Sequence, residues 1–237
     1  RTVLGGQDAA RELEMKLYNE ADPAPNPRRV RIFMKEKGID IELVPTPLMQ
    51  RAHKSPEHLA RNPLGQVPVL ELDDGTHLSE SVSICRYLEE LHPEPNLSGR
   101  EAKERATIDM WIRRIEFRLM MPVGQVWVHT HPFTAAVATA TMGQQFKDYG
   151  EANRKIIAGA CRLFDRELAA RQYFAGTRYT MADIVAQATF DFARFIGVDI
   201  PEECGNVKNW YARVGARPSA VFAVPETRLA QARNAGR

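Results

Sequence analysis

The stretch GQVPVLELDDGTHLSES, Gly65 to Ser81, contains the strongest local structural signals in this sequence. Val67 to Leu72 has the composition of a β-strand, Asp74-Gly75 is a strong turn signal, and Thr76 to Leu78 forms a second short strand pattern. Two strands joined by such a turn pair as antiparallel neighbours. The stretch therefore predicts a β-hairpin.

A proline opens this hairpin and an acid and a hydroxyl close it. Pro68 has no N–H, so it belongs at the edge or the first residue of a strand, and a Val-Pro bond can be cis at modest cost. We expect a cis bond that turns the backbone of Val67 outward. Glu80 and Ser81 stand where a helix begins, because Ile84 and later apolar residues follow at helical spacing. Each feature taken alone has a simpler structural explanation, in which the proline only ends a strand and the serine only caps a helix.

Together, this order of features resembles the glutathione-binding half of the cytosolic glutathione S-transferase family, nearest in pattern to bacterial members and to its beta, zeta and theta-like classes. In that family a Val-Pro pair with a cis proline precedes a hairpin, and a Glu-Ser pair opens the next helix. The resemblance implies that Val67, flanked by Gln66 and Pro68, pairs through its backbone with the cysteinyl unit of glutathione. It also implies that Glu80 faces the γ-glutamyl ammonium, and that Ser81 and the helix N-terminus face the γ-glutamyl carboxylate.

Strand and helix patterns divide the chain into two parts. Residues 15–91 show the βαβ, ββα order of the α/β thioredoxin-like N-terminal domain that the resemblance implies. Residues 92–100 are rich in proline and polar residues and suit a linker, whereas 101–237 show the long helical periods of an all-α C-terminal domain. The resemblance covers Met15 to about Pro225. We interpret residues 1–14 as an added or upstream extension and exclude them from the fold.

One helix start in the second half is well marked. Thr180 can cap the helix, Asp183 can return the hydrogen bond at the third helical position, and Tyr179 can pack onto Ile184. The quoted TMADI resembles the capping box of a buried helix in the same family.

Composition limits the partners. The 237 residues carry a formal net charge of +2, and no basic block alternates with aromatic residues, so nothing indicates binding to nucleic acid. No apolar run approaches the length of a membrane span, and we expect a cytoplasmic protein without membrane association.

Cysteine and histidine spacing does not predict a metal. Cys85, Cys161 and Cys204 lie far apart and form neither a disulfide framework nor a ligand set, so we expect reduced thiols. There is no C-x-x-C pair, which disfavours a dithiol redox centre. The HTHP stretch, His129 to Pro132, has two histidines but no further ligand at suitable spacing, which favours an ordinary loop over a metal site.

Activation of glutathione requires its thiol, with a free pKa of ~8.5, to ionise near neutral pH. In the resembling family the necessary donors lie at the start of the first helix. Asn26 stands at the level of the cysteine of some classes, and Ala24 replaces the serine of others, which is a departure. Asn26 can donate its amide to a sulfur anion, or it can merely cap the helix with Pro27 at the first helical position. Tyr18 is a second candidate, but its strand position favours packing against the sheet.

Two further sets of residues complete the predicted site. His53 and Lys54 precede the hairpin and can meet the glycyl carboxylate, or can be solvated loop charges. The resemblance implies an electrophile pocket between the domains, and four residues from the region that the family uses are assigned to it: Phe117, Met120, Met121 and Trp127. Such a methionine and aromatic set is also typical of a protein core.

The leading interpretation is a homodimeric glutathione transferase that takes glutathione as cosubstrate and attacks a small hydrophobic electrophile, as in detoxification. Asn26 is a poor nucleophile, so conjugation or elimination is favoured over thiol transfer. Two alternatives stay open at this point. One is a glutathione-binding or scaffold protein without turnover, and the other is a specialised glutathione-dependent lyase or reductase.

Overall fold

The computed structural model describes residues 15–21 and 23–220; the prediction for residues 1–14 lies outside this range. The first half contains β1 (Lys16–Asn19), α1 (Pro25–Lys37), β2 (Glu42–Pro45), η1 (Ala52–Lys54), α2 (Pro56–Arg61), β3 (Val69–Glu71), β4 (His77–Leu78) and α3 (Ser81–Leu91). The second half contains α4 (Ala102–Ile115), η2 (Glu116–Met120), α5 (Met121–Thr130), η3 (Pro132–Thr134), α6 (Ala135–Met142), α7 (Lys147–Leu168), α8 (Met181–Phe195) and α9 (Gly205–Gly215). Within the described ranges, no helix is both long and apolar enough to span a bilayer.

The sheet has the strand order β2-β1-β3-β4. β1 pairs in parallel with β2 and antiparallel with β3, and β3 and β4 form the predicted hairpin with Leu70 opposite Leu78. The Val67–Pro68 peptide bond is cis, as predicted. The predicted α/β thioredoxin-like half followed by a helical half is therefore confirmed.

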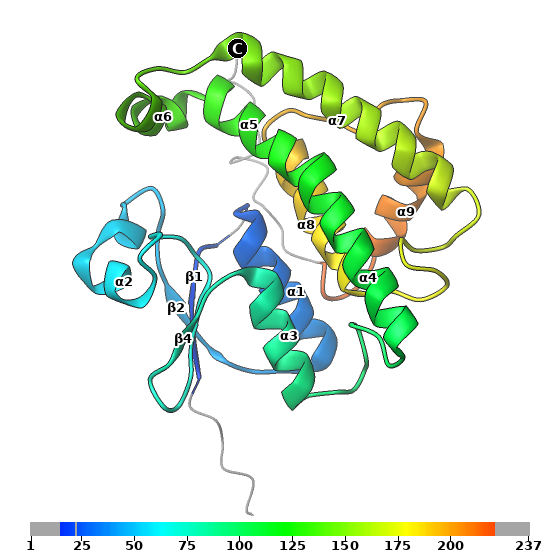
Figure 1. Cartoon of the computed structure of the whole chain (residues 1–237), viewed down its shortest axis with the longest axis horizontal. Helices are drawn as coiled ribbons and strands as arrows, with labels where there is room; N and C mark the ends of the chain where they lie inside the picture. Colours follow the sequence, from blue (N-terminus) through cyan, green and yellow to red (C-terminus); the bar gives the residue numbers. More distant parts are fainter. Residues whose placement is uncertain (1–14, 22, 221–237) are drawn as a thin grey trace, which may run out of the picture.

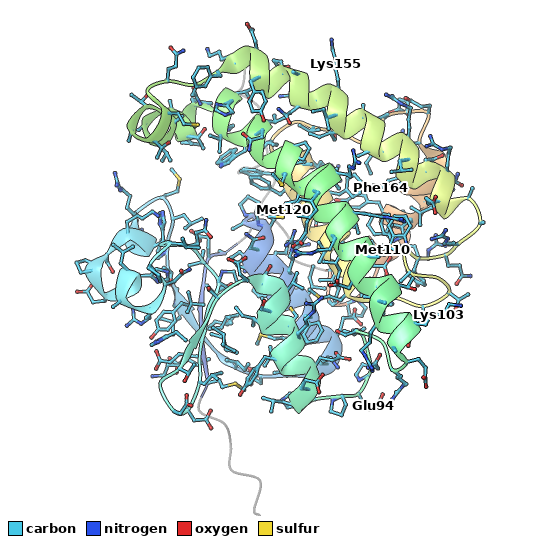
Figure 2. All side chains as sticks on the ribbon, in the orientation of Figure 1. Glu94, Lys103, Met110, Met120, Lys155 and Phe164 are labelled. Atoms are coloured by element: carbon cyan, nitrogen blue, oxygen red, sulfur yellow. The ribbon has the colours of Figure 1, made fainter. Side chains whose placement is uncertain are left out.

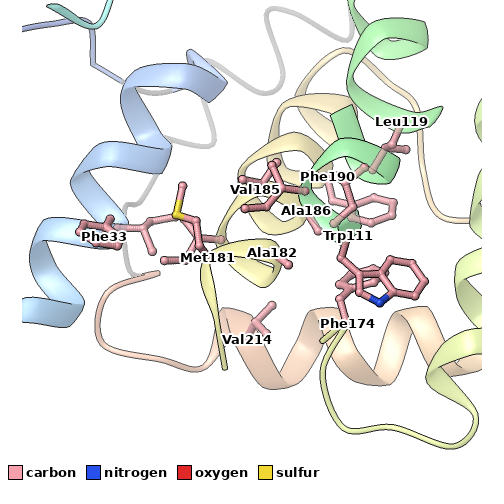
Figure 3. Packing of buried hydrophobic residues seen from close by; sticks show 14 of the residues in the cluster. Phe33, Trp111, Leu119, Phe174, Met181, Ala182, Val185, Ala186, Phe190 and Val214 are labelled. Atoms are coloured by element: carbon pink, nitrogen blue, oxygen red, sulfur yellow. The ribbon is translucent and has the colours of Figure 1, made fainter. Parts of the chain in front are cut away.

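Helices cover both faces of the sheet. In Figure 1, α1 and α3 lie on the side that faces the second half, and α2 lies on the other side. α1 packs against both α3 and α8, so it joins the two halves. Figure 3 shows Phe33 of α1 beside Met181 of α8, and both side chains are at most 1% exposed. The two halves thus share one apolar core.

α1 begins earlier than the sequence predicts. Ala24 is its N-cap, without a side-chain cap hydrogen bond, and Pro25 is the first helical residue. Asn26 and Pro27 therefore lie inside the first turn, and the expectation of an Asn26 cap with Pro27 at the first position is wrong. A proline fits the first helical position because its missing N–H has no partner there in any case. Gly38 ends the helix at φ 66°, a left-handed conformation that glycine adopts without strain.

A wide turn interrupts the long helix that the pattern of residues 103–121 predicts. η2 is a π-helix, in which the N–H of Met121 donates to the carbonyl of Glu116, one residue further back than in an α-helix. Pro122 explains it, since proline removes a helical donor and crowds the preceding turn. The extra residue brings Met120 against the first turns of α1, where Figure 2 places it.

The predicted capping box at the start of α8 is confirmed. The N–H of Thr180 donates to Oδ2 of Asp183 over 2.9 Å, within the reciprocal box of these two residues. Oδ1 of Asp183 accepts from the N–H of Phe174 and from Nε1 of Trp210, at 3.1 and 2.9 Å. Burial, opposed by these hydrogen bonds, raises the pKa of Asp183 from 3.8 to about 6.

Candidate functional site

The cis Val67–Pro68 bond leaves the main-chain N–H and C=O of Val67 available to a ligand. Val67 lies between α2 and β3, and among the described residues neither its N–H nor its C=O takes part in a hydrogen bond. Its side chain is 8% exposed, so packing fixes the residue while its peptide groups stay unpaired. A backbone in this state can pair with an extended peptide ligand, in the manner of an added strand.

The start of α3 holds an acid in an unusual backbone conformation. Glu80 is the N-cap at φ 69° and ψ 109°, a region that is unfavourable for any residue with a Cβ atom. Such strain costs about 1–3 kcal/mol and persists where the surrounding structure enforces it. The side chain of Glu80 is exposed, whereas Ser81, the first helical residue, is 5% exposed.

A buried arginine, which the sequence analysis missed, lies directly behind Ser81. Nη1 of Arg29 donates to the Ser81 hydroxyl over 3.3 Å, and Arg29 is only 2% exposed. Burial lowers the pKa of Arg29 to about 10, against the opposing effect of Glu116, so it stays a cation at neutral pH. The sequence did contain a signal, because Arg29 precedes Ile32 and Phe33 at helical spacing and therefore belongs to the buried face of α1.

The second half contributes the other neighbours of this guanidinium. Glu116 lies 3.5 Å from Nη1, and Nη2 contacts Thr189 Oγ1 at 3.4 Å and the sulfur of Met120. Glu116 also accepts from Arg113 over 3.2 Å. Glu116 is the acid in these contacts and is itself 22% exposed, and the charge of Glu80 at the start of α3 also acts to raise the pKa of Arg29.

A cavity of about 560 Å³ lies between the two halves. The loops after β1 and β2 form one wall, and the opposite wall consists of apolar side chains of η2, α5, η3 and α8. The lining includes Ala24, Pro25, Met49, Met120, Trp127, Phe133 and Phe192. Trp127 meets Phe192 edge to face with the ring centroids 5.4 Å apart. A cavity with these walls suits an apolar ligand.

The structure separates the four residues predicted for the electrophile pocket. Met120 and Trp127 line the cavity. Phe117 and Met121 are not among its lining residues and are 58% and 53% exposed, so the cavity does not support their assignment to the pocket. Strict α-helical spacing would place Phe117 and Met120, three residues apart, on nearly the same face. The wide turn of η2 between them changes this, so Met120 faces the cavity and Phe117 faces outward.

The start of α1 meets the cavity one residue before Asn26. Ala24 and Pro25 line the cavity, whereas Asn26 does not. Oδ1 of Asn26 is buried and has no hydrogen-bond partner among the described residues. The backbone N–H groups of a first helical turn have no acceptor within the helix. Pro25 and Pro27 have no N–H, so the donors of this kind in α1 are those of Ala24 and Asn26.

The remaining predicted residues are His53 and Lys54 of η1 and Tyr18 of β1. Nζ of Lys54 donates to the carbonyl of Leu64 over 3.0 Å, and burial followed by the charge of Lys54 lowers the pKa of His53. Tyr18 donates to Oε2 of Glu71 over 2.7 Å and packs on the sheet, as expected. Burial, reinforced by this hydrogen bond, raises the pKa of the Tyr18 hydroxyl, which does not line the cavity.

The two histidines of the HTHP stretch are buried among aromatic rings. His129 meets Tyr149 edge to face at 5.3 Å, and His131 stacks on Phe133 at 5.0 Å. Among residues 15–21 and 23–220 there is no group of three or more histidine, cysteine or acidic side chains arranged for a metal ion.

Comparison with known families shows matches in both halves. Residues 24–91 match the family model described as "Glutathione S-transferase, N-terminal domain". Residues 127–218 match the one described as "Glutathione S-transferase, C-terminal domain". The first match contains Val67, Glu80 and Ser81, and the second contains Trp127 and the capping box.

Individual glutathione S-transferases are similar to this chain over most of its length. Glutathione S-transferase 2 of Saccharomyces cerevisiae is 36% identical over 211 residues, which cover 88% of this chain and 89% of the relative. A glutathione S-transferase domain-containing protein of Marinobacter aquaeolei is 38% identical, with a TM-score of 0.80 over 87% of this chain and all of that chain. The structure of Gtt2 from Saccharomyces cerevisiae also has a TM-score of 0.80, at 36% identity, over 86% of this chain and 98% of that chain.

Proposed function

The chain belongs to the glutathione S-transferase family and is a glutathione transferase, and from this premise we propose how its own residues bind and activate glutathione. The observation that carries the proposal is the buried cation of Arg29 behind Ser81. A cation so far from solvent favours an anion beside it. The γ-glutamyl carboxylate is such an anion, and it meets the Ser81 hydroxyl and the N-terminus of α3 there.

Glu80 and Val67 supply the next contacts of the peptide. The exposed carboxylate of Glu80, held at a strained helix start, faces the γ-glutamyl ammonium. The unpaired N–H and C=O of Val67, between Gln66 and the cis Pro68, pair with the cysteinyl unit. His53 and Lys54 face the glycyl carboxylate, supported by the contact of Lys54 with the Leu64 carbonyl beside this segment.

The thiol then lies where the cavity meets the start of α1. Ala24 lacks a hydroxyl, so a side-chain donor of the serine type is missing at this residue. We assign stabilisation of the thiolate to the backbone N–H groups of Ala24 and Asn26, at the positive end of the α1 dipole. In this proposal Asn26 is the catalytic residue through its main chain. The electrophile occupies the apolar cavity beside Met120 and Trp127.

The proposal includes the assembly and the compartment: the protein is a homodimer in the cytoplasm. Dimers are typical of the family, and Met110, Phe117 and Met121 are exposed apolar side chains of α4, η2 and α5 that a second copy can cover. Three free, buried cysteines fit a reducing compartment.

The proposal is tested with a panel of aromatic and alkyl electrophiles and of disulfides, each assayed with and without glutathione. We expect glutathione-dependent conjugation or elimination and no disulfide reduction. Turnover restricted to disulfides would contradict the proposed role of a main-chain donor in place of a nucleophile.

A further inference from the structure

Two buried side chains hold the carbonyl oxygen of Gln66. Nε2 of His58 lies 2.9 Å from this oxygen, and Nδ2 of Asn62 donates to it over 3.1 Å. His58 is 2% exposed and Asn62 is 3% exposed. Because a carbonyl oxygen only accepts, Nε2 of His58 carries the proton. Both acceptor positions of the Gln66 oxygen are therefore occupied from the side of α2.

We propose that His58 and Asn62 are positioning residues that aim the N–H of Val67 at glutathione. The inference rests on the proposed function, which gives Val67 the cysteinyl contact. The Gln66 carbonyl and the Val67 N–H belong to one planar peptide group, and this peptide is not among the cis bonds. In a trans peptide the two groups point in opposite directions. Fixing the oxygen toward α2 therefore fixes the N–H away from α2.

The turn that presents the Gln66 carbonyl is itself tightly held. Oδ1 of Asn62 accepts from the N–H of Leu64 over 3.1 Å, and the carbonyl of Asn62 accepts from the N–H of Gly65 over 2.8 Å. Gly65 has φ 56°, and a Cβ atom there would lie 2.8 Å from the carbonyl oxygen of His53. The turn therefore requires glycine, and Asn62 connects it to Gln66 through both ends of its amide.

This arrangement matters for binding because a ligand gains most from a donor that already points at it. A peptide plane that can rotate must be ordered when glutathione binds, and this ordering weakens the affinity. His58 and Asn62 are buried and both hold the Gln66 carbonyl, so they act on glutathione through the Gln66 peptide rather than by direct contact.

Variants of similar size separate this role from packing. Asn62→Asp keeps the oxygen that accepts from Leu64 but replaces the donor by an oxygen that repels the Gln66 carbonyl. His58→Leu removes the donor, whereas His58→Gln keeps an N–H at a similar reach. We expect Asn62→Asp and His58→Leu to raise the glutathione Kd roughly tenfold, the effect of one lost hydrogen bond, and His58→Gln to restore most of the affinity. The KM for glutathione should follow the Kd, with a smaller change in kcat at saturating glutathione.

Two controls make the outcome decisive. Ser55→Ala removes the N-cap of α2, which accepts from the His58 N–H over 3.2 Å, and should lower the melting temperature with an unchanged Kd.

Glu80→Ala is the second control and tests the proposed glutathione site itself. If Glu80→Ala weakens binding and Asn62→Asp and His58→Leu do not, the positioning role is wrong. An effect of Ser55→Ala as large as that of Asn62→Asp would also overturn it. If Glu80→Ala leaves the Kd unchanged, the proposed site is wrong instead. If His58→Leu fails to fold, a comparison of the glutathione Kd of Asn62→Asp with that of Ser55→Ala still tests the positioning role.

Discussion

Nη1 of Arg29 lies 3.3 Å from the hydroxyl of Ser81, although the two residues are 52 positions apart in the chain. Arg29 belongs to α1 and Ser81 to α3, two neighbouring helices on one face of the sheet. A fully buried cation and the start of a helix thus converge on one point where the two halves meet. Both favour negative charge there.

Replacing Arg29 should therefore affect binding more than folding. Arg29→Met removes the cation but fills its volume, and Glu116 keeps its contact with Arg113. We expect the glutathione Kd to rise roughly tenfold to a hundredfold, since a charge-assisted hydrogen bond contributes about 1.5–3 kcal/mol. Titration calorimetry measures the affinity, and Arg29→Lys is the matched control, which should retain part of it. A Kd of Arg29→Met equal to that of the wild type would exclude the proposed carboxylate contact.

Glu80 combines a binding role with backbone strain, and two substitutions separate them. Glu80→Ala and Glu80→Gly both lose the carboxylate, so both should weaken glutathione binding roughly tenfold or more. Only glycine relieves the conformation at φ 69°. We expect the Gly variant to be more stable than the Ala variant by ~1 kcal/mol, measured by denaturant unfolding. Equal stabilities would show that the strain at this residue is negligible.

Asn26 can be tested as a main-chain donor by comparing Asn26→Ala with Asn26→Pro. Alanine keeps the N–H and proline removes it, and proline is tolerated in a first helical turn. We expect the pKa of the bound glutathione thiol to be unchanged in the Ala variant. In the Pro variant it should be raised by about one to two units, the equivalent of one charge-assisted hydrogen bond. Ultraviolet titration of the thiolate measures both. A raised pKa in the Ala variant would instead assign the donor to the side-chain amide.

Trp127 and Phe117 provide a matched pair for the electrophile pocket. Trp127 lines the cavity, whereas Phe117 is 58% exposed and does not. Trp127→Leu should raise the KM for an aromatic electrophile roughly tenfold through lost aromatic contact area, with the KM for glutathione unchanged. Phe117→Ser should leave both KM values close to wild type. The pocket assignment fails if the two variants have the same effect on the electrophile.

Asp183 should make stability depend on pH. Its pKa rises from 3.8 to about 6 on folding, because burial disfavours the carboxylate. The contribution of Asp183 is therefore fully present below its unfolded pKa and is lost as the pH rises through the folded pKa, by about 3 kcal/mol in total. Asp183→Asn lacks this titration. The difference in unfolding free energy between wild type and Asp183→Asn should shrink from pH 4 to pH 6, as denaturant unfolding at each pH can show. A constant difference would mean that Asp183 titrates alike in both states.

Local chemistry in the sequence determined much of the fold. The hairpin after Pro68, the end of α1 at Gly38 and the capping box of Thr180 and Asp183 follow from rules that act within a few residues. They could be predicted because their partners are neighbours in the chain. The resemblance in the stretch from Gly65 to Ser81 has the same basis, since the hairpin, the cis proline and the helix start lie within one short segment.

Which side chains from different elements face one another depends on how the helices and strands pack in three dimensions. Arg29 meets Ser81 because α1 and α3 pack on the same face of the sheet, and no local pattern states which turn of one helix touches which turn of the other. The π turn before Pro122 rotates Met120 inward and leaves Phe117 outside, which strict helical spacing does not reproduce. Sequence periodicity fixes a buried face but not its partner, because packing depends on the shapes of both surfaces.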